Sequence, residues 1–301
     1  MFGKGIARPY RRLFWANPAA QIRLLQLNQA GDTKMDSKFF APRLALLACL
    51  IVPSTAMAGT AEVLLTSKMR ISFLGFNVGV LNQNIKVADK SYEIKGGAKS
   101  NAVVSIISDA KAQFSSAGHI EGYRLIPAVQ KLTYKSGRKS GHLNVDFENG
   151  GVSTVQASPK IKYKSGTVPV EKAHLERVVD PVSSILFPVK PQDVGDGRKV
   201  CKRVLPVFDG RSRMNLVFDY KSTQSGRAKG FHGKTFTCSV RYQPISGMRP
   251  HKKNVKFMRA NRNMEVTMAR VGDSNVYAIF SFKVRTTRGM ASGSAYQFST
   301  Q

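Results

Sequence analysis

The segment Phe236–Tyr242, FTCSVRY, shows the pattern that decides the fold. Its apolar residues stand at every second position, and its polar residues occupy the positions between them. Successive side chains of a β-strand point to opposite faces of a sheet. A period of two is therefore typical of a strand with one buried side and one solvent-facing side.

The same alternation recurs on both sides of this segment. Its apolar positions are Met69-Ile71-Phe73, Ile85-Val87, Tyr92-Ile94, Leu143-Val145-Phe147, Leu216-Phe218-Tyr220 and Val276-Ala278-Phe280-Phe282. Glycine-containing turns, such as Lys135–Gly137 and Glu148–Gly151, separate the strands. We therefore predict an all-β fold, with a large twisted antiparallel sheet that forms an open or incomplete β-barrel.

One or two short helices are expected beside this sheet. The better candidate spans Asp180–Phe187, because Asp180 can cap free backbone N–H groups and Pro181 suits the first turn. Pro188 is expected to end it. A second short helix is predicted over Ser105–Ala112.

The segment Met35–Gly59 has the layout of a secretory signal peptide. Lys38 and Arg43 precede a short apolar run, and the small residues before Gly59 predict cleavage between Ala58 and Gly59. A membrane anchor is the alternative, but the run is shorter than the roughly 20 residues that cross a bilayer. We expect residues 35–58 to be the signal peptide of a protein that is not membrane-spanning.

The signal predicts how the remaining chain is organised. A compact signal normally begins a protein, so we expect residues 1–34 to be an extension added by an incorrectly assigned start codon. Residues 59–301 are then expected to form a single periplasmic β domain, a length that suits one sizeable core.

Export also determines how the cysteines are interpreted. Cys49 lies within the signal, so the mature chain keeps Cys201 and Cys238. An even pair in an exported protein predicts a disulfide. The sequence has no Cys-x-x-Cys motif and no Cys/His cluster, so neither a redox motif nor a zinc site is indicated.

The chain is strongly basic, with 47 Lys and Arg against 18 Asp and Glu. From Gly59 onward it has 39 basic and 16 acidic residues, a net charge of about +23. Outside the cytoplasm the available polyanions are envelope components such as lipid headgroups, so we expect no nucleic-acid partner. The alternative is that this charge only maintains solubility.

Two basic segments are candidates for contact with an anionic surface. In Pro159–Lys164, alternation predicts a strand with Lys160, Lys162 and Lys164 on one face. The second segment, Arg249–Arg262, contains Lys252, Lys253 and Lys256. Either segment can instead be a solvated edge or loop.

Searches for catalytic motifs give no candidate. Ala228–Thr235 ends in Gly-Lys-Thr but lacks the first glycine of a phosphate-binding loop and precedes an alternating strand instead of a helix. The five histidines lie far apart, and no serine stands in a Gly-x-Ser-x-Gly motif. We therefore expect no enzyme activity and no cofactor.

Several segments resemble one known family. Cys201–Arg213 (CKRVLPVFDGRSR) and Cys238–Gly247 (CSVRYQPISG), which includes Arg241 and Tyr242, resemble the proteobacterial exported proteins called the domain-of-unknown-function 3108 family. The Asp180-Pro181 opening and Phe73–Gly79 (FLGFNVG) add to this resemblance. It covers most of residues 59–301 and implies a β-rich periplasmic protein without established enzymatic activity, in which Cys201 and Cys238 pair.

The family-like motif Asp209-Gly210-Arg211 is typical of a tight turn. Asp209 can bond the backbone, Gly210 accepts unusual dihedral angles, and Arg211 can reach Asp209 or Asp219. A ligand-contacting Arg211 is the alternative.

Together these features favour a non-enzymatic envelope protein that binds a lipid or other envelope component and supports envelope integrity. The alternative is a structural or interaction protein that binds cell-wall polymer or partner proteins through its sheet edges. A hydrolase of envelope polymers ranks third.

Overall fold

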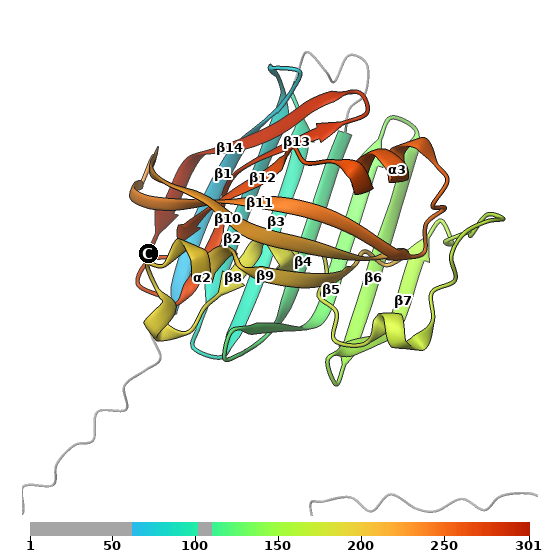
Figure 1. Cartoon of the computed structure of the whole chain (residues 1–301), viewed down its shortest axis with the longest axis horizontal. Helices are drawn as coiled ribbons and strands as arrows, with labels where there is room; N and C mark the ends of the chain where they lie inside the picture. Colours follow the sequence, from blue (N-terminus) through green and yellow to red (C-terminus); the bar gives the residue numbers. More distant parts are fainter. Residues whose placement is uncertain (1–61, 102–109) are drawn as a thin grey trace, which may run out of the picture. The chain divides into compact units, whose positions relative to one another are not determined.

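The computed structural model describes residues 62–101 and 110–301. In these residues fourteen strands form one antiparallel sheet (Figure 1). The strand order is β7-β6-β5-β4-β3-β2-β1-β14-β13-β12-β11-β10-β9, and β8 pairs with β13 outside this path. The predicted all-β fold with a large, unclosed antiparallel sheet is confirmed.

The elements have the following bounds. The first half of the sheet contains β1 (Val63–Phe73), β2 (Phe76–Val87), β3 (Ser91–Ser100), β4 (Ala110–Glu121), β5 (Arg124–Ser136), β6 (Lys139–Glu148) and β7 (Gly151–Ser158). The second half contains β8 (Leu186–Pro188), β9 (Arg203–Phe208), β10 (Arg213–Ala228), β11 (Phe231–Ser246), β12 (Met264–Arg270), β13 (Val276–Thr286) and β14 (Gly289–Thr300). The helices are η1 (Lys172–Leu175), η2 (Ser183–Ile185), η3 (Pro191–Asp193), α2 (Gly197–Cys201) and α3 (Lys253–Ala260).

The first and last strands meet in the middle of the sheet. β1 pairs with β2 on one side and with β14 on the other. Two meanders extend from this pair, one through β2 to β7 and the other back from β13 to β9. Both meanders therefore depend on contacts between the two ends of the described chain.

The main core lies between the two halves. One apolar cluster joins Leu65 and Ile94 of the first half to Val207 and Val276 of the second, all four at most 3% exposed. Figure 1 shows β9–β11 crossing the strands β2–β6 at a steep angle. The alternating pattern that predicted the strands thus places their apolar faces against each other.

The segment between β7 and β8, residues 159–185, connects the two free edges of the sheet. Glu176 forms an isolated antiparallel bridge with Gly151 of β7, and Val179 forms a parallel bridge with Val207 of β9. No ladder joins β7 directly to β9 among the described strands. The sheet is therefore an incomplete barrel whose edges are linked by this short segment.

The helix predicted over Asp180–Phe187 is wrong for most of its length. Asp180 does cap the turn, since its Oδ1 accepts from the N–H groups of Val182 (2.8 Å) and Ser183 (2.9 Å). Only the single 3₁₀ turn η2 follows. Leu186 and Phe187 then pair with Ala278 and Tyr277 of β13 and pack into two separate apolar clusters, as strand residues do.

The other helix prediction also fails where it can be compared. Of Ser105–Ala112, residues 105–109 lie outside the described part, and Ala110–Ala112 begin β4. The helices α2 and α3 occur instead where no helix was predicted. Asp196 caps α2 by accepting from the N–H groups of Arg198 and Lys199.

The strand predicted over Pro159–Lys164 is likewise wrong. β7 ends at Ser158, and the following residues are irregular. Pro159 has no N–H group to donate to a ladder, so the alternation continues without a partner strand. Lys160, Lys162 and Lys164 are nevertheless all exposed.

The predicted turns are confirmed. Asn149 and Gly150 both have positive φ and join β6 to β7, and Gly137 does the same between β5 and β6. The Gly-Lys-Thr segment lies in the β10–β11 hairpin, where Thr235 is paired with Gln224 as a strand residue.

The predicted extension (1–34) and signal peptide (35–58) lie outside the described residues, as does the predicted cleavage site between Ala58 and Gly59. All described residues belong to one unit, Met57–Gln301.

A buried polar cluster holds the connecting segment to the first half of the sheet. Asp180 is fully buried, and its Oδ2 accepts from the hydroxyls of Ser183 (2.5 Å) and of Ser116 on β4 (2.9 Å). The hydroxyls of Tyr92 on β3 and Ser183 are hydrogen-bonded at 2.7 Å. Burial raises the pKa of Asp180, although these hydrogen bonds oppose that shift.

Substitution of Asp180 should separate its hydrogen bonds from its charge. Because the pKa of Asp180 is raised above its ordinary value of 3.8, the folded protein retains its proton more tightly than the unfolded chain. This contribution to stability is present below pH 3.8 and is lost as pH rises through the folded-state pKa. Asp180→Asn should remove it, whereas Asp180→Ala should cost about 3 kcal/mol at neutral pH.

Urea unfolding of the wild type, Asp180→Asn and Asp180→Ala from pH 3.5 to 8 measures the free energy of unfolding of each protein. The wild-type free energy of unfolding should decline relative to that of Asp180→Asn as pH rises. Parallel curves for these two proteins would contradict the raised pKa.

Cys201 and Cys238 form the predicted disulfide, with an S–S distance of 2.01 Å. Both residues are fully buried in the cluster that contains Phe187 and Phe236. The bond joins the end of α2 to β11 and thereby fixes the chain just before β9 begins.

Removal of this bond should destabilise the fold. A crosslink between residues separated by 37 positions is worth about 4 kcal/mol in the chain-entropy model. Cys201→Ser/Cys238→Ser should therefore lower the Tm by roughly 10 °C. Calorimetry of both proteins, with reductant added to the wild type, gives the comparison; equal Tm values under oxidising conditions would refute a stabilising bridge.

Candidate functional site

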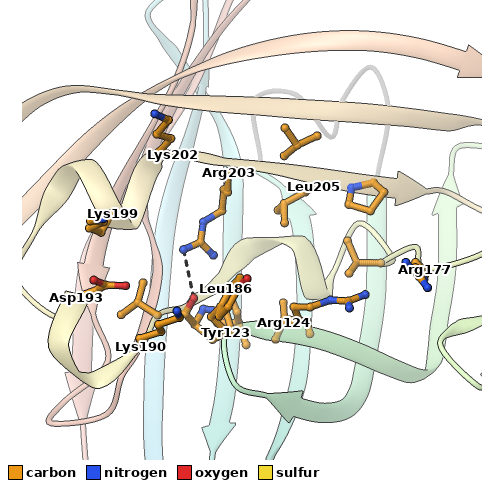
Figure 2. Close-up of a pocket in the computed structure, with 16 residues that line it drawn as sticks. Tyr123, Arg124, Arg177, Leu186, Lys190, Asp193, Lys199, Lys202, Arg203 and Leu205 are labelled. Atoms are coloured by element: carbon orange, nitrogen blue, oxygen red, sulfur yellow. Dashed lines mark hydrogen bonds between the residues drawn. The ribbon is translucent and has the colours of Figure 1, made fainter.

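A cavity of about 370 Å³, here called the cationic pocket, opens between β9, α2, the β8–η3 segment and the β4–β5 turn (Figure 2). Its lining contains six basic residues and one acidic residue, Asp193. The six are Arg124, Arg177, Lys190, Lys199, Lys202 and Arg203. This excess of cations makes the pocket attractive to an anion.

Arg203 lies in the middle of this pocket, between Arg124 and Arg177 on one side and Lys190 and Lys199 on the other (Figure 2). Its Nε donates to the carbonyl of Val200 (2.9 Å), and a terminal nitrogen donates to the carbonyl of Pro188 (3.2 Å). The guanidinium lies 4.4 Å from the centre of the Phe187 ring. These contacts hold the side chain in one orientation.

The described residues give Arg203 no acidic partner. Burial lowers the pKa of its guanidinium to about 10. No carboxylate forms an ion pair with it among the residues that the structure describes. An arginine has five N–H donors, so three remain after the two carbonyl contacts. A largely buried cation without a counter-ion is costly, and a bound anion would offset that cost.

One wall of the cationic pocket is apolar. Leu125, Val179 and Leu186 are at most 7% exposed, and Leu205 and Pro206 adjoin them. Lys190 extends over the ring of Tyr123 at 5.4 Å, which adds an aromatic surface beside the cations. The arrangement suits a ligand that is anionic at one end and apolar at the other.

None of the candidate site residues named from the sequence lines this pocket, although Pro188 and, from the family-like segment, Lys202–Pro206 do. The disulfide is the nearest of them, because Lys199, Lys202 and Arg203 flank Cys201. The sequence signal that could have indicated the pocket is the basic run Lys199, Lys202 and Arg203 around Cys201, the first residue of a family-like segment. Arg124 and Arg177 carry no comparable signal, since each stands in a different segment of a chain rich in basic residues.

The turn Asp209-Gly210-Arg211 forms as predicted. Asp209 Oδ1 accepts from the backbone N–H groups of Arg211 (2.9 Å) and Ser212 (2.6 Å), and Gly210 has a φ of 86°. The expected contact of Arg211 with Asp209 or Asp219 is absent from the ion pairs of the described residues. Its guanidinium lies instead over Tyr163, whose hydroxyl donates to the Arg211 carbonyl.

The remaining residues singled out are spread over the surface. Arg241 is exposed and Tyr242 is partly buried on β11, and burial raises the pKa of Tyr242. Lys252 precedes α3, which contains Lys253 and Lys256, and all three are exposed.

Lys160 and Lys164 border a second cavity. This cavity, here called the β7 groove, has a volume of about 950 Å³ and lies between β7, residues 160–170 and the Phe208–Gly210 turn. Its lining is mostly apolar and includes Val155, Ala157, Ile161, Val170 and Phe208. Lys162 does not line it.

The described residues contain no group of three or more His, Cys, Asp and Glu side chains placed to hold a metal ion. None of their helices is long and apolar enough to cross a membrane.

The fold and the pocket define an open, all-β protein with a cationic cavity. The chain belongs to the family described as protein of unknown function DUF3108, whose model matches residues 68–289. The family resemblance stated from the sequence is thereby confirmed. All the family-like segments quoted from the sequence lie within this range.

The chain is also similar to a solved structure, a beta-barrel-like protein of domain of unknown function DUF1849 from Brucella abortus. The sequences are 7% identical, and the TM-score is 0.45. The match covers 80% of this chain and 98% of the other. No curated protein shows significant similarity to the chain.

The uncompensated charge of Arg203 predicts stabilisation by a small polyanion. Pyrophosphate at about 100 times its Kd should stabilise the protein by roughly 2.7 kcal/mol, or about 5–10 °C in Tm. Arg203→Lys should lose at least half of this shift, because lysine lacks the planar fork that binds phosphate. Arg198→Lys, on α2 but outside the pocket lining, serves as the control; equal shifts in both variants would argue against a site at Arg203.

Proposed function

We propose that this protein is a non-enzymatic periplasmic protein that binds an anionic lipid of the cell envelope in the cationic pocket. In doing so it supports envelope integrity. The observation that carries this proposal is Arg203, a largely buried cation without a carboxylate partner among the described residues. The presence of this guanidinium is explained if a bound anionic ligand supplies the missing negative charge.

The shape of the cationic pocket supports a lipid over a small inorganic anion. Leu125, Val179 and Leu186 line the same cavity as the Arg203 guanidinium and give it an apolar wall. Burial of a single methylene group contributes about 0.8 kcal/mol, so an acyl segment along this wall would add materially to the charge interaction. The pocket volume accommodates a headgroup and the first part of a chain, and the remainder would lie outside it.

Two further features support a periplasmic location. The Cys201–Cys238 bond is of a kind that persists in oxidising compartments. Residues 35–58 carry the pattern of a signal peptide. The absence of nucleic-acid substrates in that compartment leaves anionic lipids and cell-wall polymers as partners for the basic surface.

Flotation with lipid vesicles tests the proposal. The purified protein should float with vesicles that contain phosphatidylglycerol and should not float with phosphatidylcholine alone. Arg203→Met should reduce the bound fraction at least about fivefold, while the control Arg198→Met should retain binding. Because both variants lose one positive charge, non-specific surface attraction predicts equal loss for the two and would contradict a lipid site at Arg203.

A further inference from the structure

We propose that β7 and the β7 groove form a docking site for an extended acidic segment of a partner protein, which adds to the sheet as a further strand. This proposal does not depend on the cationic pocket. It rests on the open edge of β7, the apolar lining beside that edge and the charge around it.

The outer edge of β7 has unused hydrogen-bonding groups. β7 pairs with β6 on one side, and with the rest of the described chain its other side forms only the bridge between Gly151 and Glu176. From Val152 to Ser158, no backbone hydrogen bond reaches another described segment on that side. Such a row of N–H and C=O groups is a template for an added strand.

The opposite edge of the sheet is protected, which makes the exposure of β7 informative. On β9, the Pro206 carbonyl accepts from the N–H of Val179 (2.8 Å), and the N–H of Phe208 donates to the Val179 carbonyl (2.9 Å). Pro206 itself offers no donor. β7, with the sequence GVSTVQAS, has neither a proline nor a charged residue to discourage pairing.

The β7 groove supplies side-chain contacts for the same added strand. Val155 and Ala157 face it from β7, and Ile161, Val170 and Phe208 line it from the other elements. Every second side chain of a strand points to one face, so alternate residues of an added segment would enter the groove. Apolar side chains are favoured at those positions.

The charge around the groove selects an acidic partner. Lys160, Lys164 and His142 line it, and no carboxylate is among its lining residues. Asp146 on β6 already accepts from the hydroxyl of Thr154 (2.6 Å). A second copy of this chain, paired edge to edge, would bring the same lysines together and be repelled, whereas a peptide with acidic residues is attracted.

Fluorescence anisotropy with synthetic peptides tests this site in the purified protein. An octapeptide of alternating valine and glutamate should bind, and its affinity should fall with added salt. A matched peptide of valine and lysine should bind at least about tenfold more weakly. The acidic peptide should also bind at least about tenfold more weakly when its four central residues are N-methylated. Methylation removes the backbone N–H donors on both edges of the peptide.

Protein variants locate the site. Lys160→Glu/Lys164→Glu should weaken binding at least about tenfold, whereas Lys253→Glu/Lys256→Glu, an equal charge change on α3, should leave it within twofold. Binding that survives N-methylation, or that both double variants weaken equally, would overturn the proposal. So would a self-associated dimer in the absence of peptide, or binding of a fluorescent fatty acid in the groove without peptide binding.

Discussion

The structure depends on the burial of one carboxylate, that of Asp180. Because a buried charge is tolerated only when it is fully hydrogen-bonded, Asp180 requires Ser116 from β4 and the backbone of η2 at the same time. This requirement holds the connecting segment inside the curved sheet. From that position the segment bridges β9 through Val179 and pairs with β13 through Leu186, so both halves of the sheet are positioned from a single point.

The two largely buried charges of this region differ in what surrounds them. Asp180 accepts four hydrogen bonds from the protein, and its role is complete within the fold. Arg203 is oriented by two carbonyls and an aromatic ring, yet no anion balances it among the described residues. The connecting segment contributes to both, because Leu186 and Val179 also form the apolar wall beside Arg203. The same anchoring that stabilises the fold therefore shapes the pocket.

The sequence predicts local features well and distant pairings poorly. Period-two alternation identified strands such as those containing Ile85 and Phe236. The expectation of export, together with an even pair of cysteines, predicted the disulfide. The helix expected at Leu186–Phe187 failed because a short apolar run fits either structure, and the deciding partner, β13, stands far along the chain. The pocket could not be predicted for a similar reason. Arg124, Arg177 and Arg203 come from three segments, and in a chain with 47 basic residues none stands out by type.

The central pairing of β1 with β14 has a consequence for the order of folding. Synthesis delivers the chain from its N-terminus, so β1 to β7 emerge while the middle of the sheet is still incomplete. Until β14 arrives, β1 presents a bare edge on the side away from β2. A chain stopped before Gly289 would therefore lack the β1–β14 pairing that unites the two halves of the sheet. The two halves of this sheet can therefore be joined only once the last strand has been made.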